Sequence, residues 1–103
     1  MIEKAQIKAK VTFLTAEEGG RRSAPMSGVR PQLKVGDQLT SCVVWSAIPE
    51  QLFELGKEYE VGLELMFWEQ CKDLVSTEMP IQLNEGGRIV GKGKALAIVP
   101  PAV

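Results

Sequence analysis

The chain has 103 residues, of which 45% are hydrophobic, and its formal net charge is −1. This length is typical of one compact domain, here residues 1–103, and leaves no room for a second. The near-zero net charge argues against a general nucleic-acid binder. The longest apolar stretch, residues 63–68, is interrupted by Glu64 and is far shorter than a membrane helix requires, so we expect no membrane span.

Segments in which apolar and polar residues alternate predict half-buried β-strands. The pattern is clear near the start of the chain, where Ile7, Ala9, Val11 and Phe13 would share one side of a strand. It is most regular around residue 60, where apolar residues alternate with glutamates or glycine. In chain order we expect strands over residues 5–14, 32–35, 41–45, 58–67, 79–84 and 89–99.

The segments between these strands carry turn and loop residues. Residues 17–31 hold three glycines and two prolines, which predicts a long surface loop. Residues 36–37 read as a turn, 46–56 as a connection, and 85–88, with two central glycines, as a hairpin. Residues 68–73 favour no one type of structure. Five or six strands without a sustained helix indicate an all-β barrel or sandwich, and periodicity alone fits both.

The chain contains no histidine, which removes the usual general base, the common nucleophilic triads and most zinc sites. The neighbouring glutamates at 17–18 and in the row 58, 60 and 64 are typical of solvated strand faces. We therefore expect a protein that is not an enzyme and that has no catalytic residue, no metal and no cofactor.

Cys42 and Cys71 lack the spacing of a redox or metal motif, so we expect both thiols to be packed in the core. Two such cysteines, behind a start that lacks the apolar segment of a signal peptide, favour a reducing compartment. The cytoplasm is the expected location.

Residues 86–93 nearly match a phosphate-binding loop, with two glycines five apart followed by lysine. Gly93 stands where that motif needs serine or threonine, so the hairpin interpretation is favoured. Gly91 and Gly93 would lie on the same side of a strand. They would either ease a bend of a barrel or allow another backbone to approach closely.

Charge is distributed unevenly along the chain. Residues 1–46 carry seven basic and four acidic groups, residues 47–85 carry two and nine, and residues 86–103 carry three and none. If the two ends were adjacent in space, one face would be an anion-binding surface. Its candidate groups are Arg21, Arg22, Arg30, Lys34, Arg88, Lys92 and Lys94.

The tetrapeptide Glu-Gly-Gly-Arg occurs twice, at residues 18–21 and 85–88. The first copy lies in residues 11–33, which resemble the opening of the third domain of elongation factor Tu, where a strand leads into an acidic-Gly-Gly-Arg loop and then Gly-x-Arg-Pro-Gln. The second lies in residues 80–93, which resemble that domain's closing hairpin, Arg-Glu-Gly-Gly-Arg-Thr-Val-Gly-Ala-Gly. The resemblance spans nearly the whole chain.

The resemblance implies a small closed antiparallel barrel of about six strands. In the complete factor that barrel contacts the T-stem backbone of aminoacyl-tRNA, packs against the GTPase domain and is touched by the exchange factor. By motif, Gln32 corresponds to the glutamine of Arg-Pro-Gln, and Glu85 and Gly86 to the turn near the tRNA backbone and the interdomain face. Asn84 replaces an arginine, residues 68–78 do not match, and the GTPase domain is missing, so we expect no nucleotide binding.

Two functions follow as hypotheses. In the first, the barrel binds the backbone of tRNA or another RNA through two groups of residues, Arg21, Arg22 and Arg30, and Arg88, Lys92 and Lys94. In the second, it is a protein-interaction, immunity or decoy module that mimics the elongation factor Tu barrel and contacts a partner linked to that factor. Apolar loop residues such as Met26 and Val29 would then matter more than Arg21.

Overall fold

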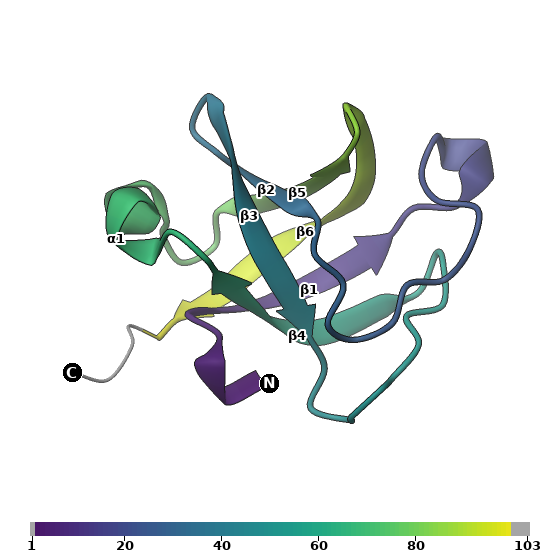
Figure 1. The fold of residues 1–103 in the computed structure, drawn as a ribbon, viewed down its shortest axis with the longest axis horizontal. Helices are drawn as coiled ribbons and strands as arrows, with labels where there is room; N and C mark the ends of the chain where they lie inside the picture. The colour runs from purple at the N-terminus through teal and green to yellow at the C-terminus, as the bar shows by residue number, and fades with distance from the viewer. Residues whose placement is uncertain (1, 100–103) are drawn as a thin grey trace.

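A computed structural model describes residues 2–99, so Pro100 and Pro101, which we expect to end the last strand, lie outside the described residues. Six strands are joined by short helical turns and loops (Figure 1). The strands are β1 (Ile7–Phe13), β2 (Gln32–Val35), β3 (Gln38–Trp45), β4 (Glu58–Leu65), β5 (Pro80–Glu85) and β6 (Arg88–Ile98). The short helical elements are η1 (Ile2–Lys4), η2 (Ala16–Glu18), α1 (Trp68–Cys71) and η3 (Lys72–Leu74).

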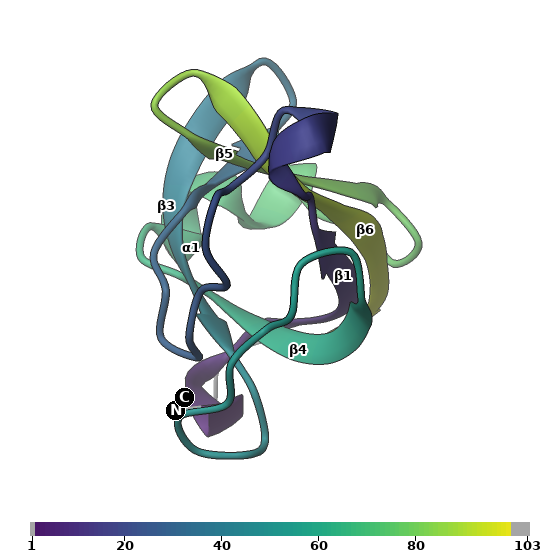
Figure 2. The same cartoon turned by 90° about the vertical axis from the view of Figure 1, so that its right-hand side faces the viewer.

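The sheet closes into a barrel in the strand order β1-β4-β3-β2-β5-β6, with every pair antiparallel (Figure 2). This confirms the predicted fold class and selects the barrel over the sandwich. Among the residues that the structure describes, no helix combines the length and apolar character that crossing a membrane would require.

The strands begin and end within two residues of the predicted positions, except at the start of β3. β3 begins at Gln38, three residues before the predicted start. Gly36, with a φ of +57°, turns the chain so tightly that residues 38–40 already pair with β2. Residues 68–73, for which the sequence favours no type, fall within α1 and η3.

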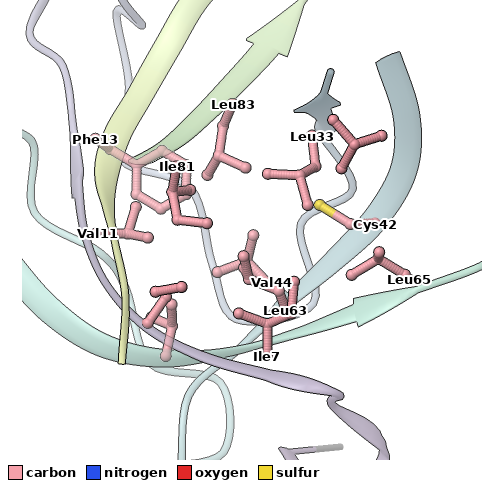
Figure 3. Packing of buried hydrophobic residues seen from close by; sticks show 14 of the residues in the cluster. Ile7, Val11, Phe13, Leu33, Cys42, Val44, Leu63, Leu65, Ile81 and Leu83 are labelled. Atoms are coloured by element: carbon pink, nitrogen blue, oxygen red, sulfur yellow. The ribbon is translucent and has the colours of Figure 1, made fainter. Parts of the chain in front are cut away.

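The core lies inside the barrel and is built from the inward side of each strand (Figure 3). Ile7, Ala9, Val11 and Phe13 of β1 are at most 1% exposed, as their alternation predicts. Phe13 stacks on Phe53 of the connection between β3 and β4, with ring centroids 5.5 Å apart. That connection therefore closes one side of the core.

Both cysteines are buried as free thiols, which confirms the packing prediction. Burial raises the pKa of the Cys42 thiol to about 12. Because the thiolate is the reactive form of cysteine, Cys42 is inert at neutral pH and acts as a small apolar residue of the core.

Closure of the barrel depends on the contact between β1 and β6. Val11 lies opposite Gly93 and Phe13 opposite Gly91. A Cβ atom on Gly93 would lie 1.8 Å from the carbonyl oxygen of Lys10, whereas one on Gly91 would lie 3.1 Å from Cδ1 of Leu83. Of the two explanations for this glycine pair, close approach therefore applies to Gly93, and the approaching backbone is that of the chain's own first strand.

We expect Gly93→Ala to lower the free energy of unfolding by about 3 kcal/mol, because backbone on two strands must separate to admit the methyl group. Gly91→Ala, the matched control, should cost about 1 kcal/mol, since only the end of the Leu83 side chain must move. Urea unfolding followed by circular dichroism measures both. Equal stability of the two variants would contradict this account of closure.

Candidate anion-binding hollow

The segment after β1 folds back on the strand that it leaves. Thr15 and Glu18 form a reciprocal capping box, in which the backbone N–H and hydroxyl of Thr15 each donate to Oε1 of Glu18 at 3.0 Å. These two hydrogen bonds, with a smaller contribution from the charge of Lys92, lower the pKa of Glu18. The backbone N–H of Arg21 then donates to the carbonyl of Leu14 at 3.1 Å. The capped turn thereby fixes the start of the Arg21 side chain.

The hairpin between β5 and β6 turns on Gly86 and Gly87, whose φ angles are +58° and +81°. Two successive residues with positive φ are what a two-residue hairpin turn of the favoured hand requires, and glycine adopts this conformation without steric cost. The turn sets Glu85 and Arg88 opposite each other on the two strands. The predicted hairpin at residues 85–88 is confirmed.

The two Glu-Gly-Gly-Arg copies meet in space. The guanidinium of Arg21, in the first copy, pairs with the carboxylate of Glu85, in the second, with 2.5 Å between Nη1 and Oε2. In return, Nη1 of Arg88 donates to the carbonyl of Gly20 at 3.1 Å. Segments more than sixty residues apart in sequence are thus held together by contacts in both directions.

A hollow of about 390 Å³ lies between these segments. In Figures 1 and 2 both segments lie at the upper end of the barrel. Among residues 2–99, the hollow is lined by Gly20, Arg21, Arg22, Ser23, Glu85, Gly86, Arg88 and Val90. Three guanidinium groups against one carboxylate leave an excess of positive charge. Chemically, the hollow is suited to an oxyanion such as a phosphate.

The structure brings together five of the eight predicted binding residues, namely Arg21, Arg22, Glu85, Gly86 and Arg88. The other three lie outside the lining. Gln32 is at the start of β2, opposite Ser41 and Asn84, and the exposed Arg30 precedes it. Lys92 points outward from β6, opposite Thr12 and Gln82. The fold therefore does not bring all eight predicted residues together in one site.

Sequence reasoning missed Gly20, Ser23 and Val90 as lining residues. Gly20 and Ser23 contribute carbonyl oxygens that accept from Arg88 and from Nε of Arg21, the latter at 3.1 Å. The repeated tetrapeptide was the available signal, because one copy follows the first strand and the other precedes the last. Residue types alone do not reveal such main-chain acceptors.

The basic ends of the chain do lie side by side, since β1 pairs with β6. Lys10 and Lys94 are directly opposite each other, but acids flank this pair. Glu60 of β4 faces Lys10 from the other side, and Glu78 lies 3.3 Å from the amine of Lys94. The outer face of these strands is therefore of mixed charge, and the excess of positive charge is found at the hollow.

The fold and the hollow define a small closed β-barrel with an arginine-lined turn region. No protein-family model matches the chain. The resemblance to the third domain of elongation factor Tu therefore stays a prediction based on the two motifs.

The ion pair between Arg21 and Glu85 is half-buried, with side-chain exposures of 23% and 32%. We expect a double-mutant cycle with Arg21→Ala and Glu85→Ala to give a coupling energy of about 1 kcal/mol in thermal or urea unfolding. The same cycle on Lys57 and Glu54, whose charged atoms lie 3.9 Å apart on an exposed loop, is the control and should give almost none. Equal coupling energies in the two cycles would show that the pair does not hold the segments together.

Proposed function

We propose that this barrel is related to the third domain of elongation factor Tu and acts without catalysis, by binding the phosphate backbone of RNA in the arginine-lined hollow. One observation carries the proposal. The two motifs on which the resemblance rests converge on one hollow, and that hollow is where guanidinium groups outnumber carboxylates.

The three arginines have different roles in this proposal. Glu85 and the carbonyl of Ser23 hold the guanidinium of Arg21, which fixes its orientation and offsets its charge. Arg88 uses one nitrogen on Gly20. Arg22, which is exposed, and the remaining donors of Arg88 contact the phosphates. Such contacts recognise the backbone and carry little sequence information.

We expect labelled tRNA, or an RNA stem, to bind with an affinity that falls steeply as salt rises, because phosphate contacts release counterions. Arg22→Ala and Arg88→Ala should each weaken binding. Each should also make the negative slope of log binding constant against log salt concentration shallower, by about 0.9 for every phosphate that the variant no longer neutralises. Fluorescence anisotropy at several salt concentrations measures both quantities.

Arg30→Ala is the matched control, since it removes an exposed arginine outside the hollow. Its salt slope should stay close to that of the unchanged protein. Binding that does not respond to salt, or that falls equally in all three variants, would remove the hollow from the proposal.

A second candidate function is the protein-interaction, immunity or decoy module. It is favoured by three apolar side chains on neighbouring loops, since Met26, Ile48 and Leu52 are 48%, 60% and 54% exposed and Met26 forms an isolated β-bridge with Leu52. Val29 does not belong with them, because it bridges to Val44 and packs against the core. The apolar surface is therefore centred on Met26 and Leu52.

If this second function holds, purified exchange factor of elongation factor Tu should bind the barrel, and the complex should persist at high salt. Met26→Ser and Leu52→Ser should weaken the complex about tenfold, because each removes a half-exposed apolar contact. Arg21→Glu should leave it intact. Calorimetric titration of the exchange factor with the unchanged barrel and with each of the three variants measures these affinities. A complex weakened only by Arg21→Glu would refute the proposal that the apolar surface binds the partner.

A further inference from the structure

A second hollow, of about 340 Å³, lies at the opposite end of the barrel from the arginines. In Figure 1 this end is the lower one, where β3 ends and η1 begins. Three segments of the chain form it, and its lining is Ile2, Glu3, Ser27, Trp45, Ser46, Ala47, Pro49 and Glu50. Apolar atoms make up most of the surface of this hollow, and within the part of the chain that the structure describes its lining includes two carboxylate residues and no lysine or arginine.

A glycine on β4 makes room for one wall of this hollow. A Cβ on Gly62 would lie 2.6 Å from Cβ of Ala5 and 2.9 Å from Cγ1 of Ile2, so η1 packs where a side chain would otherwise stand. Trp45 lies directly opposite Gly62 on β3. The absence of a side chain at Gly62 therefore lets Ile2 pack against β4, and Ile2 and Trp45 both line the hollow.

Trp45 is itself held in place. Its Nε1 donates to Oε1 of Glu64 at 2.9 Å, and its ring packs against the backbone of Gly28, where an added Cβ would lie 3.4 Å from the ring. Because the indole N–H is already satisfied, the ring can offer an incoming group only its π surface and its apolar edge.

The opposite wall is a loop fixed by Ser46. The backbone N–H of Ser46 donates to Oγ of Ser27 at 2.8 Å, and Oγ of Ser46 accepts from the N–H of Ile48 at 3.0 Å and bonds to Gln51. Glu50 has a φ of +59°, a left-handed conformation that is uncommon for residues other than glycine. The surrounding hydrogen bonds hold this carboxylate residue at the edge of the hollow in spite of that cost.

A lysine or arginine side chain matches this combination of groups. Its methylene stem suits the apolar wall of Ile2, Ala47 and Pro49, while its cationic head can approach the face of an aromatic ring and a carboxylate together. An acidic side chain would meet the exposed carboxylates of Glu3 and Glu50 with like charge, and an uncharged apolar one would gain no electrostatic attraction from them.

We propose that this hollow is a docking site for a lysine or arginine side chain presented by a partner protein. Met26, Ile48 and Leu52, exposed on neighbouring loops, would contact apolar residues beside that side chain. The proposal uses the opposite end of the barrel from the phosphate-binding hollow, so it does not depend on RNA binding and would survive the failure of that function.

The test uses the whole protein labelled with ¹⁵N and three synthetic pentapeptides, acetyl-Ala-Leu-X-Leu-Ala-amide, in which X is lysine, arginine or norleucine. Norleucine keeps the stem of lysine and removes its charge. We expect the lysine and arginine peptides to shift the indole resonance of Trp45 and the amides of residues 47–50 in a saturable manner. The norleucine peptide should bind about tenfold more weakly. Trp68→Phe distinguishes the two indole resonances.

Glu3→Gln and Glu50→Gln should each weaken binding of the lysine peptide about three- to fivefold. Glu54→Gln, which neutralises an exposed glutamate outside the hollow, should not change it. A norleucine peptide that binds as tightly as the lysine peptide would overturn the proposal, and so would shifts that map elsewhere. Shifts at Trp45 that follow the concentration of the protein itself, and not that of the peptide, would assign the hollow to a second copy of this chain and would equally refute it.

Discussion

Closure of the sheet between β1 and β6 is the constraint on which the rest of the structure depends. Because these strands are antiparallel, the end of the first lies beside the start of the last, where the backbone N–H of Leu14 donates to the carbonyl of Val90 at 2.8 Å. One Glu-Gly-Gly-Arg copy follows the first strand and the other precedes the last, so closure brings both copies to the same end of the barrel. The strand register therefore places Arg21 and Arg88 close enough to make the contacts that join the two copies.

The closed barrel also separates two hollows of opposite electrostatic character. The hollow between the Glu-Gly-Gly-Arg segments has more guanidinium than carboxylate groups, whereas the charged side chains that line the one beside Trp45 are, among residues 2–99, those of two glutamates. Glycines position both, since Gly86 and Gly87 turn the hairpin while Gly62 admits η1. If both hollows bind as proposed, the strands between the two ends keep the two binding sites apart.

Strand positions could be predicted because each strand has one face in the core and alternation records that burial directly, as at Ile7 to Phe13. The early start of β3 could not be predicted in this way, because Gln38 pairs through its backbone and its side chain is exposed. The site was predicted in part. Charge singled out Arg21, Arg22 and Arg88, and the resemblance to the elongation factor Tu barrel singled out Glu85 and Gly86. Composition does not encode the register that leaves Arg30, Gln32 and Lys92 outside the lining of the hollow. The hollow at Trp45 gave no sequence signal, because its walls come from three distant segments and depend on a missing side chain at Gly62.

The pairing of Arg21 with Glu85 also bears on what the arginine-lined hollow would select if it binds phosphate. An anion that enters must compete with a carboxylate already 2.5 Å from that guanidinium, so Arg21 gives little net attraction to a single small anion. The attraction then comes mainly from Arg22 and from the free donors of Arg88. One free phosphate binds weakly to either of these two groups. A polymer can contact both groups with successive phosphates of one backbone, and its second contact then forms intramolecularly, which strengthens binding. If the hollow binds phosphate as proposed, the ion pair that joins its two halves would therefore also favour a polyanion over a monomeric phosphate.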